Sequence, residues 1–561
     1  MFRRPARAAL VLFVYAAVAG GITWPLVANI TDHLPYTSGG APMDGLHSAW
    51  VLAYQTHALA TDPAHFGDAN MFHPTRHALF YGQTATGAVP YFALPYLATG
   101  NVAVALNVTL LAGLILTATA LHVVVLQWTA SHGAGFLAGL VFLSTRWVLW
   151  SFAPSVPQYA LLLYFPFIIL LAARPRLSTR ATVVLAVLAA LQSLMDVVYV
   201  AAAVLAPLGL LAVGLVIAGG PRRAKGWRVL AAVTFAAVCI VPIHVGHWAV
   251  RVDNPGLGAQ TTWPIGQYPL TSLQDLRMGL SPTAIPYLGL MLIVLGALLR
   301  ARGARSTRSS GTPWAYAAFF AVTGFLMSLK PPGRTDVSPD ALDGLLTFDL
   351  LRVPLRLGVV GLVALCLLVG LGFAETERAI VGRMGARRGR VVSAALVLLV
   401  ALGMQREWRL GDSLFFPGMS LPGTYPLQAV SPPEPEVLAM LRTQPGPLLE
   451  LPVRDGLPGT RGHALAMYRS TYHWHPILNG YDGYWPSGFP ERMKLAQRLP
   501  DAEALEALHR DTGLRLVLVR TAEIVGAERT KWMAAAMAGG VGHLRLAARG
   551  ESELLFRVDL P

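Results

Sequence analysis

The chain has 561 residues, of which 54% are hydrophobic and only 13% are charged. A soluble protein of this length needs more polar surface than that composition supplies, so we expect a lipid bilayer to solvate much of the chain. The net charge of +14 does not indicate nucleic-acid binding, because the basic residues cluster in short loops between apolar runs, where they signal membrane topology. Cys239 and Cys366 both lie in apolar runs, so no disulfide framework is expected.

The first apolar run follows Arg3, Arg4 and Arg7 and contains no charged residue over positions 8–31. It is long enough to cross a bilayer, and further apolar runs follow, which favours a retained signal anchor over a cleaved signal peptide. The sequence therefore predicts a polytopic α-helical membrane protein with about eleven transmembrane helices. Their expected positions are 8–28, 102–127, 133–150, 158–173, 180–197, 198–218, 229–249, 284–300, 313–329, 356–373 and 391–405.

The basic residues are distributed unevenly between the two sides of this arrangement. Nineteen Lys and Arg residues lie at the N-terminus and in the short loops of one side, against seven in the much longer loops of the other. The positive-inside rule then predicts a cytoplasmic N-terminus. The extracytoplasmic side would hold the long loops 29–101, 250–283 and 330–355, together with residues 406–561. Loops of this length are usually functional or disordered, and these are rich in aromatic residues, Pro and His, so we expect the chemistry on the outer face.

Residues 406–561 differ in pattern from the preceding transmembrane domain, 1–405. The alternation and the turn residues predict a small extracytoplasmic α/β domain. Its expected elements are strands at 447–453 and 514–520, helices at 501–511 and 529–537, and a closing hairpin formed by 543–548 and 553–558.

The first outer loop carries a candidate catalytic acid, Asp44. It stands at the start of a predicted helix in which Leu46, Trp50 and His57 recur at helical spacing. One interpretation is an N-cap carboxylate on a helix that lies along the membrane surface. The other is a general base at that surface. Composition alone favours the cap, because caps are common and catalytic residues are few.

The same loop continues with five polar residues within fourteen positions: Asp68, His73, Arg76, His77 and Tyr81. Their spacing matches no known set of metal ligands, so neither a metal nor a cofactor is predicted, although a divalent ion stays open. A cluster of this kind is a candidate for binding a charged headgroup. Ordinary hydrogen bonding within a loop is the alternative.

Arg352 and Arg356 immediately precede a predicted span on the outer side. A cation in the first turn of a helix is unfavourable without an anionic partner, and the guanidinium group binds phosphate oxygens in bidentate fashion. Phosphate binding and snorkelling to lipid phosphates therefore both remain open. Arg146 and Asp196 are ionisable residues near the edges of spans, which gives each a functional hypothesis.

Aromatic residues crowd one stretch of the C-terminal domain. Tyr472, Trp474, Tyr481 and Trp485 are candidate contacts for a sugar or an acceptor, since aromatic faces beside polar groups suit sugar rings. A packed core, with contacts to the membrane part, is the favoured alternative.

The order of these pieces is similar to a known pattern. The chain contains, in this order, an apolar helix, a long outer loop opened by Asp44, the segment Ala69–Pro74, the Arg-Val-Pro-Leu-Arg stretch at 352–356 and the tail segment His475–Pro486. Together they resemble the GT-C superfamily of membrane glycosyltransferases, particularly the bacterial set similar to protein mannosyltransferases and aminoarabinose transferases. The resemblance covers nearly the whole chain.

This resemblance implies transfer of a sugar from a polyprenyl-phosphate donor to a cell-envelope glycan, lipid or protein, at the outer face of the bacterial inner membrane. In such enzymes an acid of the first outer loop activates the acceptor, and a basic group holds the donor phosphate. Asp44 matches the first role, and Arg352 or Arg356 matches the second by location. Asp44 lacks the second adjacent acid of the clearest members, which leaves metal use and activity open.

Two other functions remain to be distinguished from an enzyme. A transporter or lipid flippase would favour charged residues and broken helices at mid-membrane, and the interiors of the predicted spans are nearly free of charge. A non-catalytic scaffold would bind glycan precursors or partner proteins through the tail. Replacing Asp44 by Asn separates enzyme from scaffold, because the enzyme alone would lose its product.

Overall fold

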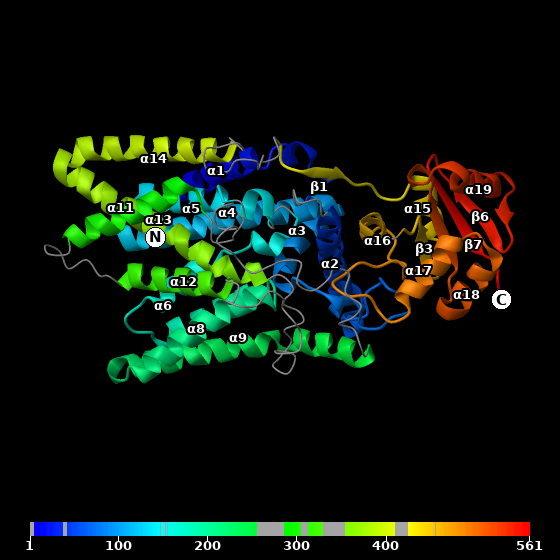
Figure 1. The fold of residues 1–561 in the computed structure, drawn as a ribbon, viewed down its shortest axis with the longest axis horizontal. Coiled ribbons are helices and arrows are strands. Elements are labelled where there is room, and N and C mark those ends of the chain that lie inside the picture. The colour runs from blue at the N-terminus through cyan, green and yellow to red at the C-terminus, as the bar shows by residue number, and fades with distance from the viewer. Residues whose placement is uncertain are drawn as a thin grey trace, which may run out of the picture.

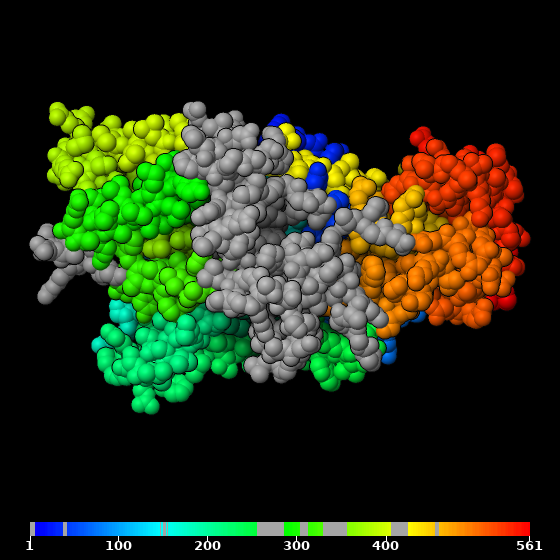
Figure 2. Space-filling model, in the orientation of Figure 1, coloured from blue at the N-terminus to red at the C-terminus, as the bar shows by residue number. Residues whose placement is uncertain are grey.

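The computed structural model describes residues 5–36, 42–145, 147–151, 153, 155–254, 285–303, 312–328, 354–409, 424–454 and 456–561. They form a bundle of long helices and, at one end of it, an α/β segment that contains the C-terminus (Figure 1). On the face shown in Figure 2, the C-terminal residues form one end of the molecule and the bundle forms the other. Most of the predicted long loops 250–283 and 330–355 lies outside the described residues.

Every range predicted as a span contains a helix. The helices are α1 (Pro5–Ile22), α4 (Val102–Thr129), α5 (His132–Leu143), α6 (Tyr164–Ala172), α7 (Thr179–Ser193), α8 (Tyr199–Ile217), α9 (Gly220–Asp253), α11 (Tyr287–Gly303), α12 (Thr312–Ser328), α13 (Val359–Met384) and α14 (Ala386–Arg409). By length and hydropathy, four helices of the described part could each cross a bilayer, namely α4, α8, α9 and the stretch Arg356–Met384. The chain thus has the apolar helices of a multi-pass membrane protein.

The third and fourth predicted spans are shorter than expected. α5 ends at Leu143 and α6 begins only at Tyr164, and the described residues between them form short turns of 3₁₀ and π helix. Proline removes a backbone donor and obstructs a continuous helix, and Pro157 opens the second of these turns. Such irregular backbone is tolerated at this depth because it is buried in protein, as the full burial of Tyr159 and Ala160 indicates.

The chain reverses between α8 and α9 and between α13 and α14 at the same end of the bundle, and α11 also ends there (Figure 1). The described residues of these junctions include many of the basic residues of the predicted cytoplasmic loops, among them Arg222, Arg223, Arg300, Arg383 and Arg387. The opposite end of the bundle faces helix α2 (Pro42–Thr61) and the α/β segment.

The α/β segment is built on a five-stranded sheet of order β3–β4–β7–β6–β5. β3 (Leu448–Leu451) runs parallel to β4 (Leu516–Arg520), and both are buried along their whole length. β4 pairs antiparallel with β7 (Glu553–Val558), which pairs with β6 (Leu544–Arg549), and β5 (Gly540–Val541) forms the edge. The helices are α15 (Pro435–Leu441), α16 (Gly456–Ser470), α17 (Phe489–Arg498), α18 (Ala502–Thr512) and α19 (Gly526–Met537). The predicted strands, helices and hairpin of the tail are thereby confirmed.

The α/β segment packs against the first predicted outer loop. In that loop, β1 (His33–Pro35) pairs antiparallel with β2 (Leu427–Ala429). The backbone N–H of Phe72 donates to the carbonyl of Asn479 at 3.0 Å, and the N–H of Ile477 donates to the carbonyl of Asn70 at 2.7 Å. The first loop and the C-terminal segment therefore form one continuous packing unit.

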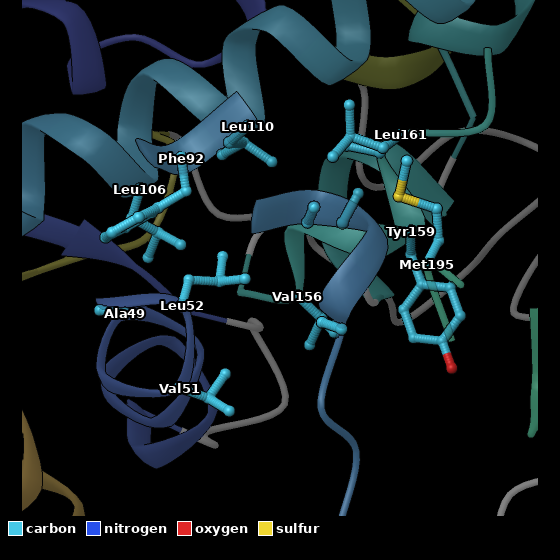
Figure 3. Close-up of a cluster of buried hydrophobic side chains, with 14 of the residues drawn as sticks. Ala49, Val51, Leu52, Phe92, Leu106, Leu110, Val156, Tyr159, Leu161 and Met195 are labelled. Carbon is cyan, nitrogen blue, oxygen red and sulfur yellow. The ribbon is translucent and has the colours of Figure 1, made fainter. Parts of the chain in front are cut away.

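Helix α2 lies across the ends of the bundle helices, between them and the α/β segment (Figure 1). Its apolar residues fit into the bundle: Figure 3 shows Ala49 and Leu52 of α2 gathered with Leu106 of α4, Phe92 of α3 (Val89–Thr99) and Val156 of the irregular segment. All five are buried. Because both faces of α2 are covered, the helix is held at a fixed angle to the bundle.

Candidate active site

Asp44 lies in the first turn of α2, at the junction of the bundle and the C-terminal segment. It is the third residue of the helix, so it does not occupy the N-cap position, which corrects that interpretation of the sequence. Its side chain is half-buried, and its Oδ1 accepts a hydrogen bond from the Tyr481 hydroxyl at 3.1 Å. A carboxylate of the first loop is thus in contact with the C-terminal segment.

His47 follows Asp44 by one helical turn and faces the same contact. Its Nε2 lies 3.5 Å from Oδ2 of Asp482, with side chains that are only 14% and 7% exposed, and its ring meets the Tyr481 ring edge-on. Burial acts to lower the pKa of His47, but the Asp482 carboxylate and, beyond it, Asp44 outweigh burial, so that pKa is raised above its ordinary value. His47 was not among the residues predicted from the sequence, although its spacing from Asp44 places both on one helix face.

Arg356 lies just before α13 and packs against the rings of Tyr159 and Tyr199. Its guanidinium carbon lies 5.2 Å from the centre of the Tyr159 ring and 5.3 Å from that of Tyr199, within the range of a cation–π interaction. The Tyr159 hydroxyl donates to Oδ2 of Asp196 at 2.6 Å, and Oδ1 of Asp196 accepts from the backbone N–H groups of Val198 and Tyr199, each at 2.9 Å. The buried Asp196 carboxylate therefore holds the Tyr159 ring in place beside Arg356.

Tyr159, which contacts Arg356, and Asp196, which bonds to Tyr159, both come from places where the helices are interrupted. Tyr159 belongs to the irregular segment between α5 and α6, and Asp196 to the bend between α7 and α8. Asp196 is 1% exposed and Tyr159 is fully buried. Asp196 thus bonds to the tyrosine that lies against Arg356, and its functional role stays a prediction.

The acid and the cation lie at the same end of the bundle, because Asp44 is in the first turn of α2 and Arg356 contacts Tyr159 of the irregular segment, which lies beside α2 in Figure 3. One charge comes from the first outer loop and the other from the segment before α13, about 300 positions later in the chain. An acid beside a fixed cation can take up a proton from one reactant while the cation neutralises negative charge on another. Arg352 and Arg146 lie outside the described residues.

The polar residues of the first loop separate into four places. Oδ1 of Asp68 accepts from the backbone N–H of His77 at 2.8 Å, so these two lie together. The ring of His73 instead bonds through Nε2 to the carbonyl of Thr512 in the C-terminal segment, at 3.1 Å. The two remaining residues, Arg76 and Tyr81, lie respectively at the surface and against the end of α9, where Asn254 donates to the Tyr81 hydroxyl at 2.7 Å.

Among the tail aromatics, Tyr481 is the residue with a described contact to Asp44. The others pack within the junction: Tyr472 against Tyr468, Trp474 against His57 with ring centres 4.1 Å apart, and Trp485 against Phe489. No group of three or more His, Cys, Asp or Glu side chains able to hold a metal ion occurs within the described part of the chain.

This combination of helical bundle, crossing first-loop helix and C-terminal sheet has solved counterparts. The apo crystal structure of ArnT from Cupriavidus metallidurans matches with a TM-score of 0.51 and 14% identity, covering 99% of this chain and 98% of that one. The structure of ArnT bound to undecaprenyl phosphate matches with a TM-score of 0.50 and 12% identity, over 97% of each chain. The chain has the GT-C fold.

The GT-C resemblance of the sequence is thereby confirmed at the level of fold and over nearly the whole chain. The Archaeoglobus fulgidus oligosaccharyltransferase, in its apo form, is more distant, with a TM-score of 0.44 and 11% identity over 91% of this chain and 69% of that one. No protein-family model and no curated protein sequence matches the chain.

Proposed function

We propose that this protein transfers a sugar from a polyprenyl-phosphate donor to a cell-envelope glycan, lipid or protein at the outer face of the bacterial inner membrane. The observation that carries the proposal is the presence, at one end of the bundle of a GT-C fold, of the half-buried Asp44 carboxylate and of the Arg356 cation packed against two tyrosine rings. The ArnT structure with bound undecaprenyl phosphate supports a lipid-linked donor for this fold.

Asp44 is the proposed general base. An acceptor hydroxyl or amine attacks the anomeric carbon of the donor sugar while its proton passes to the Asp44 carboxylate. The new bond to the anomeric carbon forms as the bond from that carbon to the phosphate oxygen breaks, and polyprenyl phosphate leaves with the bonding electron pair.

Arg356 is the proposed partner of the donor phosphate, with Arg352 as a second candidate. Negative charge builds up on the leaving phosphate oxygen, and a cation placed in advance stabilises that charge without reorganisation. The tyrosine rings hold the guanidinium group near a fixed position, and its planar set of N–H donors suits the oxygens of a phosphate. Fixing that group through Tyr159 and Asp196 reduces the entropy lost when the phosphate binds.

The orientation of the protein is also a proposal. The basic junctions lie at the end of the bundle opposite α2, and the positive-inside rule assigns that end to the cytoplasm. The site and the C-terminal segment would then lie outside the cytoplasm, where membrane-bound donors and envelope acceptors meet.

The test is Asp44→Asn in purified protein in nanodiscs. Asn keeps the shape of the side chain and can still accept the Tyr481 hydrogen bond, but an amide cannot take up the proton. We expect the release of undecaprenyl phosphate from undecaprenyl-phosphate-linked hexoses or pentoses, with a cell-envelope extract as acceptor, to fall by roughly 10²- to 10⁴-fold.

The matched control is Asp62→Asn, an exposed acid of the same loop that pairs with His65 at 2.9 Å. It should retain the wild-type rate. Transfer at the wild-type rate by the Asp44 variant would reject the catalytic proposal and leave a scaffold or a transporter of glycan or lipid precursors as the better account.

A further inference from the structure

A short turn of the C-terminal segment, residues 480–483, enters the site from the side opposite the bundle. Two glycines permit this approach: a Cβ on Gly480 would overlap the Phe72 ring, and a Cβ on Gly82 would overlap the Asp482 carboxylate. The backbone N–H of Tyr481 contacts the Met467 sulfur at 3.1 Å, which anchors the turn from the other side. These close contacts fix the position of the turn relative to α2.

We propose that Tyr481 is a positioning residue of the glycosyl transfer, whose hydroxyl orients the Asp44 carboxylate for proton abstraction. The inference deepens the proposed function and rests on it. It means that the C-terminal segment completes the active site instead of forming a separate binding module.

Three features of Tyr481 suit this role. Its side chain is only 8% exposed, so the hydroxyl is held in place. Its hydrogen bond to Asp44 has a length of 3.1 Å, and its ring edge packs on His47, which fixes the helix face that carries the acid. A neutral hydroxyl also orients a carboxylate while lowering its basicity less than a full positive charge would.

The charged and titratable groups around Asp44 come from three elements of the described structure. His47 lies on α2 itself, Tyr481 belongs to the turn together with Asp482, and Arg356 precedes α13. A hydrogen bond to the ionised form of a carboxyl group lowers its pKa, so losing the Tyr481 hydroxyl should raise the pKa of Asp44. Because the base must be ionised, activity should then be lost at a higher pH when the solution is acidified.

The experiment compares Tyr481→Phe with wild type in the transfer assay across pH. Phe keeps the ring that packs on His47 and removes the hydroxyl alone. We expect kcat to fall by roughly 10- to 100-fold, with unchanged KM for the donor, and the acidic limb of the profile to move to higher pH. Tyr91→Phe is the matched control, because it removes a tyrosine hydroxyl bonded at 2.7 Å to Tyr164 away from the site, and it should behave as wild type.

The double variant Asp44→Asn with Tyr481→Phe shows whether the hydroxyl acts through Asp44. If it does, the double variant should be no slower than Asp44→Asn alone. Additive losses, an unshifted profile, or a raised acceptor KM with unchanged kcat would overturn the positioning role. A normal Tyr481→Phe rate beside an inactive Asp44→Asn would reject this inference alone, whereas an active Asp44→Asn would reject the proposed function.

Discussion

Arg356 lies within cation–π distance of two tyrosine rings, Tyr159 and Tyr199. An ammonium group in the same place would keep the charge but would lack the planar set of N–H donors that binds two phosphate oxygens at once. We expect Arg356→Gln to raise the KM for the polyprenyl-phosphate donor by more than about tenfold, and Arg356→Lys to fall between Gln and wild type.

Donor titration of the purified variants measures this effect, with the exposed Arg549→Gln in β6 as the control. An unchanged donor KM in Arg356→Gln would mean that this arginine reaches lipid phosphates of the bilayer and not the donor.

Some individual site residues could be predicted from the sequence and others could not. Asp44 and Arg356 stand out locally, because an acid at a helix start and a cation at the edge of a span are unusual in an apolar chain. The contact between Asp44 and Tyr481 joins positions 437 residues apart, and no local periodicity indicates which aromatic of the tail will meet the acid. The burial of Asp196 beneath Tyr159 is a tertiary effect of the same kind.

At the scale of elements, the contact between the first loop and the tail depends on Asn70. Its Oδ1 accepts from the Trp50 indole, and its Nδ2 donates to Oγ of Ser470 and to the carbonyl of His475, all at 3.0 Å. Asn70→Ala would leave these buried or half-buried groups without this partner, at a cost of about 1–3 kcal/mol for each group left unsatisfied.

We expect a lower midpoint of thermal unfolding and slower transfer in Asn70→Ala, because Trp50 of α2 and the segment 470–475 would lose the side chain that joins them. Asn70→Asp should be intermediate, since it retains the acceptor for Trp50 and loses both donors. Asn29→Ala removes a bond to the carbonyl of Pro25 within its own turn and serves as the control. An unfolding midpoint in Asn70→Ala equal to that of Asn29→Ala would contradict this role.

The helices could be located from the sequence because apolar runs interrupted by charges are a strong signal. Their ends were less predictable: the run 133–150 is apolar apart from a few residues such as Arg146, and 158–173 is uncharged, yet α5 and α6 cover only parts of them. Burial in protein stabilises both helical and irregular apolar backbone, so hydropathy does not distinguish the two. The backbone pairing of Phe72 with Asn479 was likewise unpredictable, because it carries no side-chain pattern.

At the scale of the whole molecule, the charged end and the catalytic end of the bundle should face opposite sides of the membrane. Single cysteines test this in a background in which Cys239 and Cys366 are replaced by Ser. Lys531→Cys in α19 and Arg223→Cys in α9 both occupy exposed positions. In spheroplasts, a membrane-impermeant maleimide should label position 531 directly and position 223 only after permeabilisation.

Complete labelling of both sites in detergent controls for their reactivity. Labelling of position 223 in intact spheroplasts, with position 531 protected, would reverse the orientation and remove the basis for chemistry at the outer face.

Because residues near 70 bond to residues near 475, the first loop can complete its contacts only late in biosynthesis. Asn70 and Ser470 are 400 positions apart. At a translation rate of about 5–20 residues per second, roughly 20 to 80 s therefore pass between the synthesis of Asn70 and that of Ser470. During that interval Asp44 is already translated, while the segment that supplies Tyr481 is not. A chain that ends before that segment therefore carries the acid without its partner, and the contact forms only after the segment has been synthesised.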